Sequence, residues 1–466
     1  MKAYKYKIFT DKIEEGILNG TLKAGDKLPS VRTIKAGYRL SISSVQSGYD
    51  YLVFKGLVTS MPRLGYIVAE RGFVNLETGR LPSIVRDAVF KDNVLMTSKR
   101  IMHLEQVSLN VAMPDDVFVP QKLVLKTMQE VIREKGASLL RYYPNNGSEE
   151  LISLIVKRSA LHGTMMQPDE VIITDGALQA LYIALASVTS VGDIIAIESP
   201  CVFSVLEVIA NLHLRTIEIP VSLSNGLDLD YLDNVCKDNK IKAIVLTPNF
   251  HNPTGILLSE EKKEQLYKIA VHYNTPIIEN DIYGDLYFEG SRPNNIKSYD
   301  TEGLVLTYSS FSKTLAPGLR LGWLAAGQFF AKAERLKFSL GRSVSPINQE
   351  VMIKILSSSN YDKHLRVFRD KLARQASMLI NYIQTYLPNV IILEIPHGGY
   401  SIWCELNKNI DSSTFYKHCE EAGVYFTSGE TFTFTHMYDS CFRVIFSQQV
   451  TQADLEVLKK LGQALK

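Results

Sequence analysis

Apolar residues recur at helical spacing in the first seventy residues of the chain and predict three short helices. The first ends at Asn19-Gly20, the second begins after Ser30, and the third stops at Gly56. Two short apolar runs, 57–61 and 66–69, then flank a turn and predict a β-hairpin. The apolar positions of the first and third helices are Ile8, Ile13, Ile17, Leu18, Val45, Tyr49, Leu52 and Val53.

Beyond residue 104 the pattern changes to short apolar runs that alternate with helical stretches. The runs lie at 171–174, 194–197, 243–246, 276–279 and 304–308. Helices are predicted between them, for example over 178–188 and 260–273. Runs rich in β-branched residues that alternate with helices indicate an α/β fold with a buried, largely parallel sheet.

The segment between these two parts has no clear period. Gly79, Pro82 and mixed charges interrupt it, although the piece from Ile84 to Phe90 has helical character. We therefore expect a partly structured linker over 73–104, between an N-terminal domain of residues 1–72 and a body of residues 105–466.

Composition narrows the class of protein. The chain has 466 residues, of which 46% are apolar and 21% charged, which excludes a disordered or fibrous protein. No apolar stretch is long enough for a membrane span, and the first ten residues do not resemble a signal peptide. The five cysteines are scattered, which favours free, buried thiols in a reducing cytoplasm. They are Cys201, Cys236, Cys404, Cys419 and Cys441.

Charge separates the two parts further. The formal net charge is only +2, but residues 1–75 carry twelve Lys or Arg against six Asp or Glu, hence +6. The remainder carries 39 bases and 43 acids, hence −4. A small basic head on a mildly acidic body suggests a polyanionic partner for the head, although such an excess can also arise by chance.

Three helices and a β-hairpin form a winged helix-turn-helix, an α+β module that binds double-stranded DNA. The outward face of its third helix carries Ser43, Ser44 and Gln46, which can reach base edges or phosphates. A module used only for packing is the other reading of this pattern.

The head resembles the GntR family of bacterial DNA-binding domains. The resemblance rests on residues 17–32, which read Ile17-Leu-Asn-Gly-Thr-Leu-Lys-Ala-Gly-Asp-Lys-Leu-Pro-Ser-Val-Arg32, on Gly56-Leu-Val58 and on the glycine-containing wing. The family usually has an Arg early in the third helix, where this chain has Ser41-Ile-Ser-Ser-Val45. Either three other basic side chains contact the DNA phosphates, or DNA binding is weak. These side chains are Arg32, Lys35 and Arg63.

Polar residues follow the strand-like runs of the body, where α/β proteins bind ligands. The turn Asp175-Gly-Ala-Leu178 leads from a strand into a helix, and the N–H groups of Ala177 and Leu178 can hold a phosphate. Ser310, Ser312 and Arg320 can add hydroxyl and guanidinium groups to it. Lys313, flanked by small residues after an apolar strand, can be desolvated enough to act as a nucleophile that forms an imine.

Polar residues that follow two further strands complete the set of groups that one cofactor needs. Asp281 follows a strand as a lone carboxylate that a protonated ring nitrogen would stabilise, and Asn252 and Tyr283 can bind a ring hydroxyl oxygen. A phosphate cradle, an imine-forming lysine and a carboxylate for a pyridinium together describe a site for pyridoxal 5'-phosphate. No metal site is expected.

The body resembles the fold-type I aminotransferases, whose fold is a large mixed-sheet domain with a smaller α+β domain. The most specific block is Ser310-Phe-Ser-Lys-Thr-Leu-Ala-Pro-Gly-Leu-Arg320, and the resemblance implies that Lys313 is the catalytic Schiff-base lysine. It implies that Arg443, with Asn252, binds the substrate carboxylate. It also implies that Tyr142 reaches the phosphate of a neighbouring subunit, hence a homodimer with a head-to-tail arrangement. The aromatic residue that stacks on the ring is replaced by Val202, and Phe203 is the candidate for that position.

A GntR-type head before such a body is the layout of the MocR subfamily of bacterial regulators. The resemblance implies a transcriptional regulator dependent on pyridoxal phosphate, which senses an amino compound or the cofactor through Lys313. The alternative is an active aminotransferase with a DNA-binding head, since Lys313, Asp281 and Arg443 suffice for transamination or one half-reaction. A third class is a protein that only stores the cofactor. The first two imply a cytoplasmic protein with no membrane partner.

Overall fold

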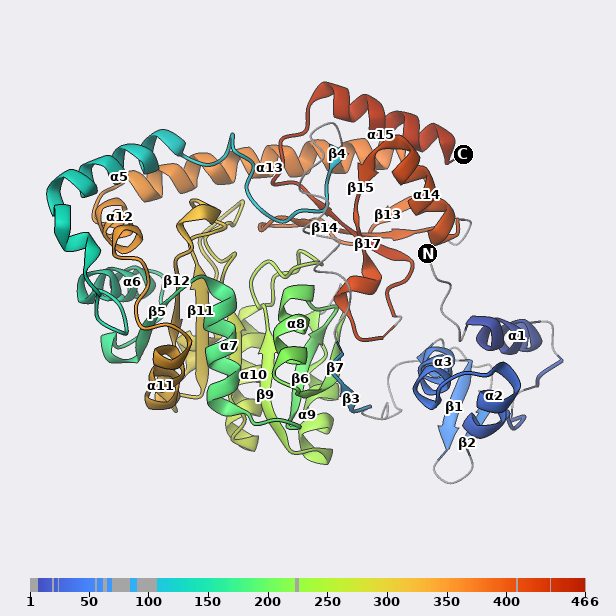
Figure 1. Cartoon of the computed structure of the whole chain (residues 1–466). Helices are drawn as coiled ribbons and strands as arrows, with labels where there is room; N and C mark the ends of the chain where they lie inside the picture. The colour runs from blue at the N-terminus through green and yellow to red at the C-terminus, as the bar shows by residue number, and fades with distance from the viewer. Residues whose placement is uncertain are drawn as a thin grey trace. The chain divides into compact units, whose positions relative to one another are not determined.

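The computed structural model describes residues 7–18, 21–23, 25–54, 57–61, 65–68, 84–89, 107–222, 226–407, 410–435 and 437–465. The chain divides into two compact units, of which the first takes Met1–Leu81 and the second most of Pro82–Lys466. Figure 1 shows both. No helix in these described ranges combines the length and the apolarity that crossing a membrane requires.

The first unit is a winged helix-turn-helix, as predicted. Its elements are α1 (Lys7–Leu18), α2 (Val31–Tyr38), α3 (Ile42–Phe54), β1 (Val58–Met61) and β2 (Gly65–Val68). The two strands pair antiparallel, with Val58 opposite Val68. Ser30 caps α2, because its hydroxyl accepts a hydrogen bond from the Thr33 N–H at 3.2 Å. Apolar side chains from all three helices and both strands form one core, which includes Ile13, Val45 and Tyr49.

The body is built on a mixed sheet in which the five predicted strands are present and mutually parallel. Its order is β3 (Arg86–Asp87), β7 (Arg215–Ser222), β6 (Ile194–Ser199), β9 (Ile241–Leu246), β10 (Ile277–Asn280), β11 (Val305–Ser310), β12 (Gly322–Ala325) and β5 (Val171–Thr174), with β8 (Gly226–Leu227) beside β7. The strand β12 runs antiparallel to both of its neighbours. The predicted mixed-sheet domain is thus confirmed.

Helices cover both faces of this sheet (Figure 1). They are α6 (Glu149–Leu161), α7 (Ala177–Val188), α8 (Phe203–Asn211), α9 (Leu229–Asp238), α10 (Glu260–Tyr273) and α11 (Phe330–Leu340), while α5 (Gln121–Lys135) packs on α12 (Pro346–Leu356), which packs on α6. Successive strand residues alternate between two cores: Val245 packs with α7 and α8, whereas Ile244 packs with α9 and α10. A sheet buried on both faces explains why its strands read as continuous apolar runs.

A smaller α+β domain follows in the sequence. The long helix α13 (Asn360–Tyr386) leads into it. Its sheet has the order β13 (Val390–Ile392), β14 (Ser401–Leu406), β17 (Cys441–Ile445) and β16 (Thr427–Ser428), and it also contains α14 (Ser412–Ala422) and α15 (Gln452–Ala464). The strand β4 (Val107–Ser108) pairs with β15 (Val424–Tyr425), so the start of the body joins this domain. Short 3₁₀ helices are η1 (Gly136–Leu140), η2 (Pro168–Glu170), η3 (Ile296–Tyr299), η4 (Pro317–Leu319), η5 (Gly327–Phe329) and η6 (Gly429–Phe432).

Part of the expected linker belongs to the large sheet. Arg86 and Asp87 form β3 and pair antiparallel with Thr216 and Arg215 of β7, and the Ala88 N–H donates to the Leu214 carbonyl at 3.2 Å. The helical character predicted from residue 84 is therefore wrong, because the open edge of β7 supplies backbone partners that a local pattern does not reveal. The rest of 73–104 lies outside the described residues, and the predicted domain boundaries stay predictions.

The cysteines are as expected from their spacing. All five are free and buried, and all five belong to the body. Burial is the first cause that raises the pKa of each thiol, for example to about 12 at Cys236 and at Cys419.

Candidate functional site

The predicted site residues of the body gather at the carboxyl ends of β5, β9, β10 and β11. Because parallel strands end at the same edge of a sheet, the segments that follow them meet there. Gly176, Asn252, Asp281 and Lys313 each lie a few residues beyond one of these strands.

Lys313 lies in the turn that follows β11. Its Nζ donates a hydrogen bond to the Ala112 carbonyl at 2.5 Å, and the Tyr400 hydroxyl donates to the Lys313 carbonyl. Burial, followed by the positive charges of Arg443 and Arg320, lowers the pKa of Lys313 to about 8. About a tenth of this amine is therefore neutral near pH 7, far more than for an ordinary surface lysine.

Asn252 joins Tyr283 to Arg443. Its amide nitrogen donates to the Tyr283 hydroxyl at 3.3 Å, and its carbonyl oxygen accepts from Arg443 Nη1 at 2.9 Å. Arg443 Nη2 donates to the Asn110 carbonyl at 2.7 Å and to the Thr427 hydroxyl at 3.1 Å. These contacts fix the orientation of the Arg443 guanidinium, which is linked to the Tyr283 hydroxyl through Asn252.

Arg443 is a buried cation without an acidic partner. Within the described residues no carboxylate pairs with it, and its Nε has no hydrogen-bond partner. Burial lowers its pKa to about 10. Keeping a desolvated guanidinium unpaired is costly, so the position favours an anionic ligand.

The predicted phosphate cradle depends on close backbone contacts. Ala177 and Leu178 begin α7 directly after Gly176, which has φ 81°. Arg320 Nη2 donates to the Asp175 carbonyl at 3.1 Å, and a Cβ on Gly176 would lie 2.8 Å from that nitrogen. Ser310 and Ser312 share a hydrogen bond of 2.9 Å between their hydroxyl groups. The start of α7 and Arg320 are thus in direct contact, as a phosphate cradle would need, and the part of the two hydroxyls in it stays a prediction.

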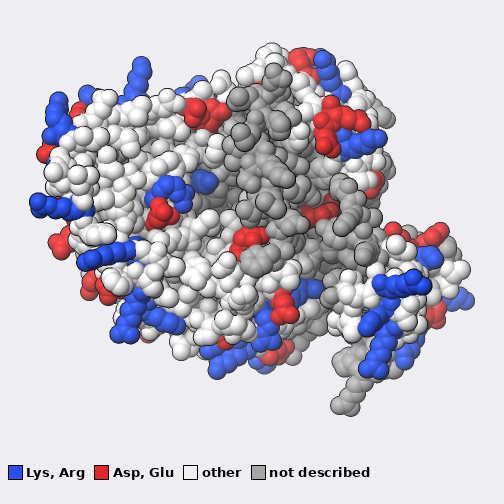
Figure 2. All heavy atoms as spheres, in the orientation of Figure 1, with Lys and Arg blue, Asp and Glu red and all other residues white. Residues whose placement is uncertain are grey.

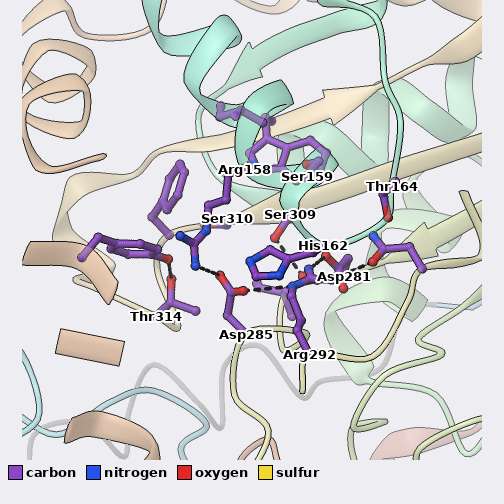
Figure 3. Close-up of a pocket in the computed structure, with 16 residues that line it drawn as sticks. Arg158, Ser159, His162, Thr164, Asp281, Asp285, Arg292, Ser309, Ser310 and Thr314 are labelled. Carbon is purple, nitrogen blue, oxygen red and sulfur yellow. Dashed lines mark hydrogen bonds and ion pairs between the residues drawn. The ribbon is translucent and has the colours of Figure 1, made fainter. Parts of the chain in front are cut away.

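Asp281 follows β10 and is buried. Its carboxylate forms an ion pair with Arg292, and Asn249 Nδ2 lies 3.4 Å from the other carboxylate oxygen. Its own carbonyl accepts from the Ser309 hydroxyl at 2.9 Å. Figure 3 shows Asp281 and Arg292 side by side in a pocket that Asp285 and His162 also line.

Two predicted residues lie apart from this cluster. Phe203 begins α8, and its ring lies 6.4 Å edge-on from Phe432, a ring that in turn lies 4.9 Å from the Arg443 guanidinium. Tyr142 is 76% exposed and lies 5.0 Å from the guanidinium carbon of Arg342. No contact between Tyr142 and the cluster is seen in the described part of this one chain.

Sequence reasoning missed three charged residues. Arg292, Asp285 and Arg158 form ion pairs around Asp281, with Arg292 Nε 2.9 Å from Asp285 and Arg158 3.4 Å from the same carboxylate. Arg292 reaches Asp281 only because the loop after β10 folds back. No spacing in the sequence indicates that return.

The candidate DNA interface lies on the head. Arg32 and Lys35 of α2 and Gln46 of α3 are exposed, and Figure 2 shows Lys and Arg side chains gathered on one face of the head. Ser41 acts as a cap of α3, since its hydroxyl accepts from the Ser44 N–H at 3.1 Å, and the Ser44 hydroxyl lies 2.7 Å from it. Arg63 and the side chain of Ser43 lie outside the described residues.

Comparison with known proteins places both parts of the chain. Residues 106–460 match the family of class I and II aminotransferases, and residues 5–68 match the gntR family of bacterial regulatory proteins. The uncharacterized HTH-type transcriptional regulator YdcR of Escherichia coli is 30% identical over 99% of both chains. YjiR of the same organism, with the same description, is 29% identical over 99% of this chain and 98% of its own.

The body also matches solved aminotransferases. The kynurenine aminotransferase of Pyrococcus horikoshii superposes with a TM-score of 0.75 and 25% identity, covering 81% of this chain and 95% of that one. The two Escherichia coli relatives named regulators cover 99% of this chain, whereas the relatives named aminotransferases cover 77% of it, which favours regulation over catalysis as the function. The chain thus belongs to the class I and II aminotransferase family through its body and, with its GntR-type head, is a DNA-binding transcriptional regulator of the MocR layout.

Proposed function

We propose that the body binds pyridoxal 5'-phosphate at Lys313 and that the state of this lysine controls DNA binding by the head. The observation that carries the proposal is a pair of neighbouring cations, Lys313 after β11 of the large sheet and Arg443 in β17 of the smaller sheet. Lys313 and Arg443 are both desolvated, and neither has a carboxylate partner within the described residues. Such a pair favours a ligand that brings its own negative charge and a group that reacts with a neutral amine.

The surrounding residues fit this cofactor. Phosphate oxygens would accept from the N–H groups of α7 and from Arg320, and the ring nitrogen would face Asp281. Asn252 and Tyr283, already hydrogen-bonded to each other, would hold the ring hydroxyl oxygen. When bound, the cofactor supplies an aldehyde that forms imines with amines. The similar Pyrococcus horikoshii enzyme was solved with PMP.

Arg443 supports a carboxylate on the sensed compound. Its guanidinium is held by Asn252, Asn110 and Thr427, so its orientation does not depend on the ligand. An amino acid, or another amine that carries a carboxylate, would therefore compete with Lys313 while its acid group is bound. The cofactor itself is the second effector that the site can sense. Either one changes the covalent state of Lys313, which is the signal we propose.

A homodimer fits the exposed residues of the body. Tyr142 projects beside Arg342, consistent with a tyrosine that reaches the phosphate of a neighbouring subunit in a head-to-tail pair. Large apolar side chains are exposed on the same part of the chain, and an exposed apolar group of this kind is typical of an interface. They include Leu125, Ile132, Leu140, Phe338 and Leu340. Two heads would read two half-sites of DNA, and the regulator would act in the cytoplasm.

The test measures DNA binding by gel shift at the region upstream of the gene itself, with and without cofactor. Lys313→Ala should lose both the visible absorbance of the imine and the response of DNA binding to cofactor. Lys332→Ala, which removes an exposed lysine of α11, is the matched control and should behave as the wild type. DNA binding that is identical in all these conditions would rule the proposal out.

A further inference from the structure

Arg292 is bound on every side by groups of its own loop. Its Nη2 contacts the Asp281 carboxylate, its Nε donates to Asp285 at 2.9 Å, and its Nη1 donates to the side-chain Oδ1 of Asn295 at 2.8 Å. Figure 3 shows this guanidinium between the two aspartates. Each of the three guanidinium nitrogens thus makes a contact, and together they connect Asp281 to Asp285 and Asn295.

Asp281 has little freedom beside this guanidinium. The side chains of Asp281 and Arg292 are only 2% and 11% exposed. A Cβ on Gly284 would lie 2.3 Å from one Asp281 oxygen and 2.7 Å from Arg292 Nη2, so the loop backbone closes directly over the pair. The second oxygen of the carboxylate, which Arg292 does not bind, is the one that this Cβ would meet, and it lies 3.4 Å from Asn249 Nδ2.

A carboxylate this deeply buried binds a proton readily unless a cation neutralises it. In the described residues Arg292 is the cation in contact with Asp281. Its own charge is retained: although burial alone would lower the pKa of Arg292, Asp281 and Asp285 raise it above its ordinary value. The partner Asp285 is ionised as well, because Arg158 and Arg292 outweigh its burial and lower its pKa to about 2.

Other ionisable groups face Asp281 but do not touch it. Glu279 of β10 is fully buried, and burial first, with Asp281 as a further cause, raises its pKa to about 7. Lys263 of α10 has its pKa lowered by burial and is bound to Glu260. Arg158 and His162, in and just after α6, face Asp285, and burial lowers the pKa of His162. None of them can replace the direct ion pair.

We propose that Arg292 is a positioning residue, which keeps the Asp281 carboxylate ionised and turned toward the ring nitrogen of a cationic heteroaromatic ligand. The inference rests on the proposed function and extends it, because it identifies which group prepares Asp281 for that ligand. A prepared carboxylate needs neither to lose a proton nor to rotate when the ligand arrives.

The test uses the full-length protein and pyridoxal 5'-phosphate as the probe. Dissociation constants are measured by absorbance between pH 5.5 and 8.5, and each variant is divided by the wild type at the same pH, which cancels the titration of the probe itself. For Arg292→Gln this ratio should rise as the pH falls, by about tenfold per pH unit below the point where Asp281 takes up a proton. Arg292→Lys, which keeps a cation, should give a flat ratio.

Arg158→Gln is the matched control, since Arg158 also pairs with Asp285 but does not touch Asp281. Its ratio should be flat. A flat ratio for Arg292→Gln, or an equal rise for Arg158→Gln, would overturn the inference, because a merely structural loss weakens binding alike at every pH. If the wild type itself binds no cofactor, the proposed function fails instead.

A second measurement decides the matter even if Arg292→Gln does not fold. Infrared difference spectra of the wild type minus Asp281→Asn report the protonation of this one carboxyl group in the cofactor-free protein. The carboxylate band should persist down to pH 5.5. A protonated carboxyl band above that pH would show that Arg292 does not hold Asp281 ionised.

Discussion

At the scale of single residues, the main feature of the site is that two buried cations have no carboxylate partner within the described residues. Lys313 donates only to a backbone carbonyl, and Arg443 donates to an amide, a carbonyl and a hydroxyl. Neutral acceptors bind several of these donors, though not Arg443 Nε, and they do not compensate the charges. Both pKa values are therefore lowered by burial, to about 8 and about 10.

The lowered pKa of Lys313 predicts how fast the protein takes up cofactor as pH changes. The neutral amine is the reactive form, so the rate of imine formation should rise with pH and level off above about 8. Arg443→Gln removes the second cause of the lowered pKa, after burial, and should move the midpoint to higher pH. Stopped-flow absorbance measures the rate, and Arg366→Gln, at an exposed position of α13, should leave the midpoint in place.

Gly176 predicts a weak point of the phosphate cradle. Its φ of 81° and ψ of 177° suit glycine alone, and a Cβ would press on Arg320. Gly176→Ala should cost about 1–3 kcal/mol in backbone strain and weaken cofactor binding, because Arg320 is displaced. Gly318→Ala, a glycine of η4 with open space around it, should change neither thermal stability nor affinity by titration. Equal losses in the two variants would contradict this account.

Part of this residue-scale picture could be predicted from the sequence. Asn252, Tyr283 and Arg443 were expected to serve one ligand, and the structure joins them by hydrogen bonds. Arg292 could not be predicted, because its contact with Asp281 depends on how an irregular loop returns. Residue type at a strand end is a local property, whereas a contact across a loop is set by tertiary packing.

At the scale of elements, β3 is the unexpected feature. Two residues of the expected linker extend the large sheet, and their backbone hydrogen bonds do not depend on side-chain pattern. The five parallel strands were predictable, since burial on both faces leaves continuous apolar runs. The antiparallel β12 was not, because Gly322-Trp-Leu-Ala325 follows an irregular turn and is too short to show a period.

The added strand predicts that residues 84–89 are protected from proteolysis. Ala88→Pro removes the N–H that donates to Leu214, so residues 84–89 should detach from the edge of β7 and be cut faster in limited proteolysis followed by mass spectrometry. The melting temperature of the body should change little, since one edge hydrogen bond contributes about 0.5–1.5 kcal/mol. Ala88→Ser keeps the N–H and serves as the control. Unchanged cleavage in Ala88→Pro would mean that the pairing does not persist in solution.

At the scale of the whole molecule, the uneven distribution of charge distinguishes DNA binding by the head from ligand binding by the body. The head has a charge of +6 over residues 1–75, which attracts DNA electrostatically, and the ligand site in the body would modulate that binding rather than supply it. Binding to DNA should then weaken steeply with salt, as release of counterions requires. Ligand binding in the body should depend less on salt, because Asp281 and Arg443 are buried.

This difference gives a prediction for single basic residues of the head. Arg32→Gln should weaken binding to all DNA sequences alike and reduce the slope of log affinity against log salt by about 1. Fluorescence anisotropy at several salt concentrations measures that slope. Lys126→Gln, which removes an equally exposed base from α5 of the body, should leave it unchanged. A loss confined to one DNA sequence would instead assign Arg32 to base recognition.

The buried cysteines make the chain well suited to site-specific labelling. All five native thiols are enclosed in the body, and residues 1–72 contain none. A cysteine introduced at exposed Gln46 would therefore be the one thiol open to a dye or cross-linker, with every native cysteine left in place. The native thiols would react only when the body opens, so a single alkylation experiment would follow the DNA-facing helix and the integrity of the ligand-binding core separately.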